Sequence, residues 1–231
     1  MIIESAHIAT VLEHSKTTPT RSCLIIFDVD NVLVEPCGWV GGTPWFEYEL
    51  NKRIEQGVDS KQAFEQVLAL CVQFQHAIEL KLVDPQTAEI VKALQAQGHC
   101  VIALTSRAPA QAERTIAQLK KLGIDFSISC FNAQAIDKPY SFQSGIIFCQ
   151  TYAKSQAVIE LLEDAHYLPE TILFIDDFLK NVQALHVALK DWNPAISYIG
   201  IRYSYLDGKR VDVSAAQQEL ENLQKQTAST L

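Results

Sequence analysis

The sequence predicts an α/β fold, a doubly wound parallel sheet with a small helical cap inserted after the first strand. Short, continuous apolar runs alternate with helical patterns along most of the chain. Such runs are typical of strands that helices cover on both faces. The alternation stops once, between Glu35 and Val83, where helical patterns follow one another without a strand. This interruption predicts the cap.

The expected strands are the apolar runs, most of which lack the period-two alternation of a half-exposed strand. They are Cys23–Asp28, Cys100–Thr105, Phe126–Cys130, Gly145–Cys149, Ile172–Asp176 and Ile196–Arg202. Helices are expected between them, and the first begins at Asp84-Pro85, a good N-cap and first-turn pair, and stops near Gly98. The others are Pro109–Leu122, Tyr152–Ala165, Lys180–Lys190 and Val213–Leu223.

The cap is predicted from two helical patterns, Trp45–Ile54 and Lys61–Leu82. In the second, apolar side chains recur at helical spacing and form a stripe. The expected division of the chain is therefore a core domain of residues 1–34 and 84–231 and a cap of residues 35–83.

Composition excludes several classes of protein. The 231 residues carry a formal net charge of -8, which repels phosphate backbones and argues against a general nucleic-acid binder. No apolar run is long enough to cross a membrane, and the N-terminus does not read as a signal peptide. We expect a cytoplasmic protein with no membrane partner. Whether the chain has a protein partner does not follow from the sequence.

The six cysteines are interpreted as small buried hydrophobic residues. None forms a CxxC pair, and no zinc-ligand spacing is present. This usage agrees with a reducing compartment. The cysteines are Cys23, Cys37, Cys71, Cys100, Cys130 and Cys149.

The predicted strands end in polar side chains. Ligands of open α/β sheets bind outside the carboxyl ends of the strands, so these side chains are expected to gather at one site. Turn and cap residues are often Asp, which explains one such residue better than the whole set. The set consists of Asp28 and Asp30 at the end of the first strand, Thr105, Ser106 and Arg107 at the end of the second, Lys154 after Gly145–Cys149, and Asp176 and Asp177 at the end of Ile172–Asp176.

Carboxylates crowded at one edge raise one another's pKa unless a cation offsets them. Mg²⁺ takes carboxylates, waters and phosphate oxygens as ligands. The sequence therefore predicts a magnesium site that also receives a phosphoryl group. Lys154 fits this site, because a cation in the first turn of a helix opposes the helix dipole and needs another reason to be there.

These residues resemble the motifs of the haloacid-dehalogenase-like (HAD) superfamily. Asp28-Val29-Asp30-Asn31-Val32-Leu33 is similar to the first motif, Thr105 to the second, Lys154 to the third, and ILFIDDFLKN, residues 172–181, to the fourth. The motifs occur in the superfamily's order. The segments GGTPWFEYEL and ALTSR further resemble an uncharacterised bacterial subfamily.

The resemblance implies a HAD-like core and a phosphatase that works through an aspartyl-phosphate. Asp28 would be the nucleophile, and Asp30 the general acid and base. Thr105 and Lys154 would stabilise the transferring group. The resemblance also implies the Mg²⁺ ligands, which would be Asp28, the backbone carbonyl of Asp30, Asp176 and Asp177. A carboxylate at Asp30 favours phosphoryl transfer over dehalogenation.

Further expectations concern substrate binding. Ser106 and Arg107 could contact a substrate anion, Trp45 could line the entrance, and Asn181 could orient a ligand. A helix-entry salt bridge for Arg107 and ordinary packing for Trp45 are the plainer interpretations. The expected substrate is a small phosphomonoester. A phosphotransferase and a non-catalytic metal- or phosphate-binding module stay open as alternatives. A receiver domain is set aside, because it places its acidic pair first.

Overall fold

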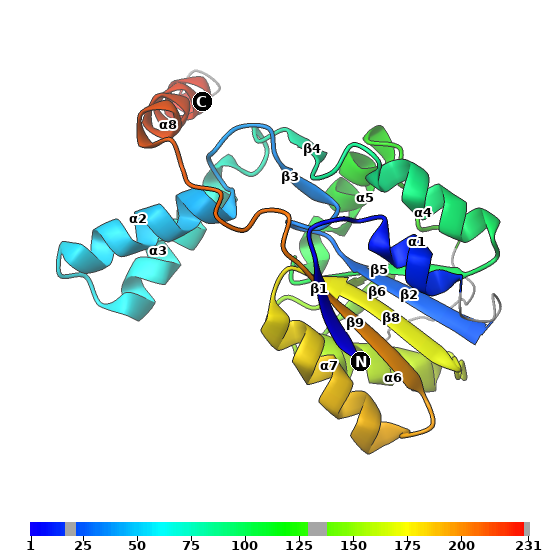
Figure 1. The fold of residues 1–231 in the computed structure, drawn as a ribbon. Coiled ribbons are helices and arrows are strands. Elements are labelled where there is room, and N and C mark those ends of the chain that lie inside the picture. Colours follow the sequence, from blue (N-terminus) through cyan, green and yellow to red (C-terminus); the bar gives the residue numbers. More distant parts are fainter. Residues whose placement is uncertain (17–21, 129–137, 229–231) are drawn as a thin grey trace. The chain divides into compact units, whose positions relative to one another are not determined.

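The computed structural model describes residues 1–16, 22–128 and 138–228. It divides into two compact units, each built from separate parts of the chain. The first unit consists of Met1–Val34 and Leu82–Leu206, and the second of Glu35–Lys81 and Asp207–Leu231. Figure 1 shows the elements of both.

The first unit is built on a seven-stranded sheet with the order β1-β9-β8-β2-β5-β7-β6. All neighbouring strands are parallel except β6 and β7, which are antiparallel. The predicted α/β class with a mostly parallel, doubly wound sheet is confirmed. The strands are β1 (Ile2–Ser5), β2 (Cys23–Asp28), β5 (Cys100–Thr105), β6 (Ser141–Gln143), β7 (Ile146–Phe148), β8 (Thr171–Asp176) and β9 (Ser197–Tyr203).

Helices cover both faces of this sheet (Figure 1). On one face α1 contacts α4 and β8, and α4 contacts β5; on the other, α6 and α7 contact each other and α7 contacts β8 and β9. The helices of this unit are α1 (Thr10–Ser15), α4 (Thr87–Ala96), α5 (Ala112–Lys121), α6 (Lys154–Asp164) and α7 (Leu179–Trp192).

The central strand β2 is buried along its whole length, which explains its continuous apolar sequence. Because side chains of a strand point alternately to opposite faces, its residues split between two cores. Leu24 and Ile26 pack in the cluster that includes Val158 and Leu161 of α6. In β8, Ile172 and Phe174 belong to the same cluster. The even-numbered residues of β2 and β8 therefore face α6 and α7.

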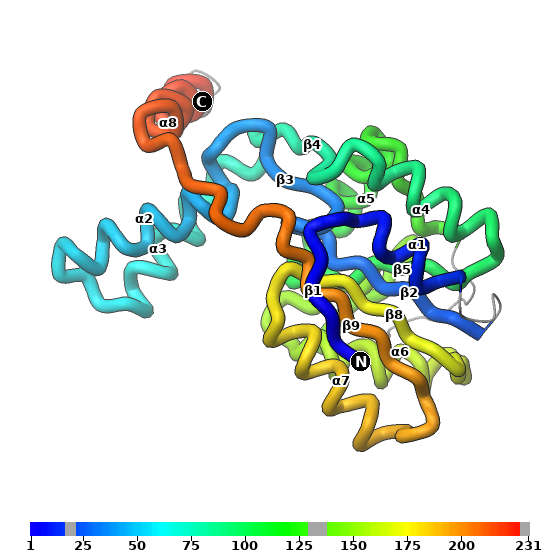
Figure 2. The backbone as a smooth tube through the Cα atoms, in the orientation of Figure 1, coloured from blue at the N-terminus to red at the C-terminus, as the bar shows by residue number. Residues whose placement is uncertain are grey.

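The edge strand β1 was not predicted. It pairs in parallel with β9, and Ile2 lies opposite Gly200. Figure 2 shows the two segments side by side, although they come from opposite ends of the sequence. The predicted strand Phe126–Cys130 is wrong for residues 126–128, which form a turn or have no regular structure, and its last two residues lie outside the described part.

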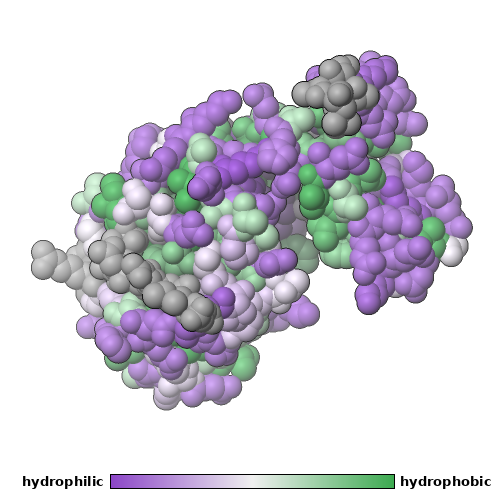
Figure 3. Space-filling view, turned by 180° about the vertical axis from the view of Figure 1, so that it is seen from behind, coloured by the Kyte–Doolittle hydropathy of each residue, from purple (hydrophilic) through white to green (hydrophobic). Residues whose placement is uncertain are grey.

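The second unit contains α2 (Thr43–Glu55), α3 (Ser60–Phe74) and α8 (Val213–Ala228). Its core consists of Val40, Trp45, Val67, Phe74, Ala216 and Leu223. Figure 3 shows apolar surface on this unit among mainly hydrophilic side chains. Short strands β3 (Val34–Pro36) and β4 (Leu80–Leu82) form a separate two-stranded sheet where the chain passes between units. The predicted helix Lys61–Leu82 is thus too long, since α3 ends at Phe74.

The C-terminal segment differs from the prediction. The sequence assigned residues 84–231 to the core domain, but Asp207–Leu231 belongs to the second unit. The reason lies in its contacts, because the Glu219 carboxylate accepts hydrogen bonds from the backbone N–H groups of Trp39 and Val40. Gly38 permits this contact, since a Cβ there would lie 2.2 Å from a Glu219 oxygen.

One cysteine contradicts its predicted state. Cys100, at the start of β5, is disulfide-bonded. Cys23 and Cys149 are buried and free, as the sequence predicts for small hydrophobic residues, and Cys37 and Cys71 are also free. Disulfides persist mainly in oxidising compartments, whereas the expectation of a reducing compartment rested on free cysteines.

Candidate active site

The site forms where β2, β5 and β8 end. Phe27 pairs with Ile175, and Asp28 lies beside Leu104, so Asp28, Thr105 and Asp176 leave neighbouring strands at nearly the same level. Adjacent strands are about 4.8 Å apart. The sheet register therefore brings the ends of these three strands together.

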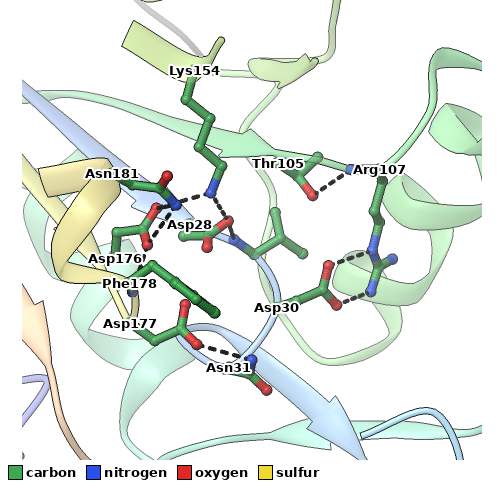
Figure 4. A network of polar contacts seen from close by, with 11 residues as sticks. Asp28, Asp30, Asn31, Thr105, Arg107, Lys154, Asp176, Asp177, Phe178 and Asn181 are labelled. Atoms are coloured by element: carbon green, nitrogen blue, oxygen red, sulfur yellow. Dashed lines mark hydrogen bonds and ion pairs between the residues drawn. The ribbon is translucent and has the colours of Figure 1, made fainter. Parts of the chain in front are cut away.

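Asp28 and Asp176 continue the even-numbered set that faces α6. Lys154 is the first residue of α6, and its Nζ lies 2.8 Å from Asp28 Oδ1 and 2.8 Å from Asp176 Oδ2. All three side chains are nearly or fully buried. Figure 4 shows the lysine between the two carboxylates. The arrangement explains a cation in the first turn of a helix, because the ion pairs outweigh its unfavourable interaction with the dipole.

The charge in this cluster is unbalanced. Burial raises the pKa of Asp28 well above its usual value, and the charges of Asp176 and Asp177 raise it further, although Lys154 opposes them. Burial and Asp176 likewise raise the pKa of Asp177 to about 6. For Lys154, burial acts to lower the pKa, but the charges of Asp28 and Asp176 outweigh it and the pKa is raised. The single ammonium group of Lys154 therefore offsets the negative charge of several carboxylates only in part.

These carboxylates fit a divalent cation. Oxygen atoms of Asp28, Asp176 and Asp177 all lie within 4.8 Å of one another. A hard cation with oxygen ligands would offset the repulsion that raises the pKa values of Asp28 and Asp177. The predicted ligands Asp28, Asp176 and Asp177 are thus brought together. The carboxylate of Asp30 is directed elsewhere, to Arg107.

Hydrogen bonds from amide side chains hold the acidic pair. Asn181 Nδ2 lies 3.0 Å from both carboxylate oxygens of Asp176, and Asn31 Nδ2 donates to Asp177 Oδ2 over 3.0 Å. Such partners orient the ligands of a metal. Asn181 was predicted to orient a ligand, and its contact is with Asp176. The role of Asn31 was missed.

The backbone conformation of Asn31 and two hydrogen bonds from backbone N–H groups to the carboxylates were also missed. Asn31 has a φ of 64°, a left-handed conformation that Asn adopts more readily than most residues. In the sequence, the available signal for this conformation was an asparagine at the position between Asp30 and Val32. The backbone N–H groups of Val29 and Phe178 donate to Asp28 Oδ1 and Asp176 Oδ1, both over 2.8 Å. Both bonds orient the acceptor carboxylates.

Arg107 and Thr105 lie on the opposite side of Asp28 from Asp176 (Figure 4). Thr105 is fully buried and its Oγ1 accepts a hydrogen bond from the Arg107 N–H over 3.1 Å. The Arg107 guanidinium forms a two-pronged pair with Asp30, with Nε and Nη2 at 3.0 Å and 2.7 Å from the carboxylate oxygens. Neither residue was predicted to pair with the other.

The remaining predicted substrate residues differ in exposure. Ser106 is exposed beside Thr105. Trp45 is only 1% exposed and lies in the core of the second unit, so its side chain does not offer a surface to a ligand. The prediction for Trp45 is therefore wrong, and the packing interpretation explains this tryptophan.

A family model described as "Protein of unknown function (DUF2608)" matches residues 4–230 of the sequence. The chain belongs to the DUF2608 family. The GGTPWFEYEL and ALTSR segments that suggested an uncharacterised subfamily both lie within the matched residues.

Among curated proteins, the DUF2608 chain is similar to two chlamydial relatives, each named "Putative outer membrane protein". The one from Chlamydia trachomatis is 24% identical over 180 residues, which cover 78% of this chain and 68% of the relative. The one from Chlamydia pneumoniae matches with the same identity and coverage. Every helix in the described part of the DUF2608 chain is too short or too polar to cross a bilayer.

Solved structures similar to the chain include HAD-like hydrolases. A haloacid dehalogenase-like family hydrolase from Streptococcus pneumoniae is 14% identical, with a TM-score of 0.44, and the match covers 79% of this chain and 95% of that chain. A class C acid phosphatase from Bacillus anthracis is 14% identical, with a TM-score of 0.43 and coverage of 95% and 84%.

Proposed function

We propose that this DUF2608 protein is a Mg²⁺-dependent phosphohydrolase of the HAD type, which hydrolyses a small phosphomonoester through an aspartyl-phosphate at Asp28. The observation that supports this most strongly is the position of Lys154 between Asp28 and Asp176, with Asp177 beside them. A buried carboxylate paired with an ammonium group is suited to nucleophilic attack on a dianionic phosphoryl group.

The metal would be held by Asp28, Asp176 and Asp177, and by the backbone carbonyl of Asp30. Bound there, Mg²⁺ supplies positive charge that keeps the carboxylates ionised and offsets the charge of the phosphoryl group. Asn31 and Asn181 keep the acidic pair in place through the bonds described above.

In the first half of the reaction, an Asp28 oxygen attacks phosphorus while the bond from phosphorus to the ester oxygen breaks. Lys154 stabilises charge on the phosphoryl oxygens, and Asp30 gives its proton to the leaving oxygen. In the second half, Asp30 takes a proton from water, the water oxygen attacks phosphorus, and the Asp28 carboxylate is released. Thr105, whose oxygen accepts from the Arg107 N–H, donates its own hydroxyl hydrogen to the phosphoryl group.

The place of action has two candidates. The cytoplasm is the location that the sequence predicts. An oxidising compartment is favoured by the disulfide at Cys100, and the names of the chlamydial relatives agree with a location outside the cytoplasm.

The proposed activity is tested by phosphate release from an aryl phosphate and from a panel of small phosphomonoesters, with Mg²⁺ or with a chelator. We expect Mg²⁺-dependent release that Asp28→Asn abolishes and that Asp191→Asn, an exposed change at the far end of α7, leaves intact. Release that is unchanged in Asp28→Asn would refute the mechanism. Transfer of phosphate to an added alcohol, with little free phosphate, would identify a phosphotransferase.

A further inference from the structure

Arg107 is held more firmly than the residue with which it pairs. Besides its two bonds to Asp30, its Nη1 donates to Thr115 Oγ1 over 3.0 Å and to Gln118 Oε1 over 3.1 Å. Both acceptors belong to α5. The Arg107 side chain is 16% exposed, whereas that of Asp30 is 51% exposed. The guanidinium is therefore fixed, and Asp30 is the partner that can move.

The proposed chemistry requires that movement. Figure 4 shows the Asp30 carboxylate pointing to Arg107 and away from Asp28, Lys154 and Asp176. To exchange a proton with an oxygen bound to phosphorus at Asp28, the carboxylate has to turn from Arg107. Arg107 Nε and Nη2 would then lose their acceptors. A largely buried guanidinium without an anion is unfavourable, so another anion has to take the place of Asp30.

A second guanidinium group, that of Arg114, adds to the positive charge that needs an anionic partner. Arg114, near the start of α5, has its Nη1 buried without a hydrogen-bond partner in the described structure. Burial and the nearby charge of Arg107 both lower the pKa of Arg114. The charges of the two arginines thus act on each other, and the ion pair described for Arg107 is with the exposed carboxylate of Asp30. An arginine fork matches a carboxylate or a phosphate in geometry as well as in charge.

We propose that Arg107, together with Arg114, binds a second anionic group of the substrate, a carboxylate or a phosphate, in the place that Asp30 occupies in this structure. The preferred substrates are then small phosphomonoesters with a second anion close to the ester. Their binding releases Asp30 for proton transfer. Arg107 is thus both a specificity-determining residue and the one that positions Asp30. This inference rests on the proposed function, because it assigns the substrate class of the same site.

The test compares esters that differ in the second group: ethyl phosphate with none, phosphoglycolate with a carboxylate, and ethylene glycol bisphosphate with a phosphate. The readout is the ratio of kcat/KM for an anionic ester to that for ethyl phosphate, since a general loss of activity cancels in this ratio. We expect a ratio of about tenfold or more in the wild-type protein. Whichever of the two anionic esters has the higher ratio identifies the second group.

The ratio should fall to near one in Arg107→Gln and decrease several-fold in Arg114→Gln. Lys120→Gln removes a charge from the same helix at an exposed position that pairs with Asp125, and it should keep the wild-type ratio. If Arg107→Gln does not fold, the more exposed Arg114 still provides the test. Ratios near one in the wild-type protein, with ethyl phosphate turned over in an Asp28-dependent way, would overturn the inference and leave the proposed function standing.

A binding experiment separates the two proposals if no ester is turned over. Calorimetric titration of phosphoglycolate into Asp28→Asn should show affinity that falls about tenfold when Arg107→Gln is added and that Lys120→Gln leaves unchanged. Equal affinities in all these variants would overturn the inference, whatever the activity.

Discussion

The raised pKa of Asp177 makes the metal-free protein sensitive to pH. Its pKa rises from 3.8 to about 6 on folding, first because the carboxylate is buried and then because Asp176 lies beside it. The folded state thus holds this proton more tightly than the unfolded state. The associated stability is fully present below about pH 4 and is lost as the pH rises to about 6. A shift of about two units corresponds to about 3 kcal/mol.

Replacement of Asp177 by Asn removes this penalty. The Asn carboxamide oxygen can still accept the bond from Asn31 Nδ2, so the shape of the site is kept. In a chelator at about pH 7.5, we expect Asp177→Asn to be more stable than the wild-type protein by up to about 3 kcal/mol. For a chain of this size that is about 6–12 °C in Tm.

The assay is urea and thermal unfolding from about pH 4 to pH 8, with a chelator and with Mg²⁺. Mg²⁺ should raise the Tm of the wild-type protein more at high pH than at low pH, and it should raise that of Asp177→Asn much less. Asp191→Asn, an exposed change on α7, controls for net charge. The reasoning is refuted if the stability curves of wild type and Asp177→Asn run parallel through this range in chelator.

Three further results are expected. Lys154→Met should lower kcat about 100-fold or more in phosphate-release assays, because it removes the cation between Asp28 and Asp176; a loss of less than about threefold would contradict its role. Gly145→Ala should lower the Tm clearly, since the residue has a φ of +76° and a Cβ would lie 2.0 Å from the Phe126 carbonyl oxygen; an unchanged Tm would show that the turn does not need glycine. Alkylation of the unfolded, non-reduced protein followed by peptide mapping should label Cys23, Cys37, Cys71 and Cys149 but not Cys100, and labelling of Cys100 would contradict its disulfide.

The parallel core could be predicted because local sequence and environment agree there. Runs such as Ile172–Asp176 are apolar throughout because helices cover both faces, and that burial leaves a direct trace in the sequence. The edge strand β1 leaves no such trace, since its side chains alternate between exposed and half-buried positions and its pairing with β9 spans nearly the whole chain. Long-range pairing of this kind has no local signal.

The site was predicted to a similar degree. Asp28, Thr105 and Asp176 follow from strand ends and motif order, since the register of a parallel sheet places the ends of their strands side by side. Lys154 follows from motif order and from its unusual place in the first turn of a helix. The pairing of Arg107 with Asp30 does not follow, because it depends on how two loop side chains turn. The place of Asp207–Leu231 in the second unit likewise rests on a contact between Glu219 and a distant backbone segment.

The most direct test of the account is to trap the covalent intermediate. The protein would be mixed with Mg²⁺ and a phosphomonoester that it turns over, quenched in acid, treated with borohydride to reduce an acyl phosphate, and mapped by peptide mass spectrometry. The account predicts reduction at Asp28 alone, and none in Asp28→Asn or in the presence of a chelator. Mg²⁺-dependent phosphate release without modification of Asp28, or with modification of another residue, would contradict it.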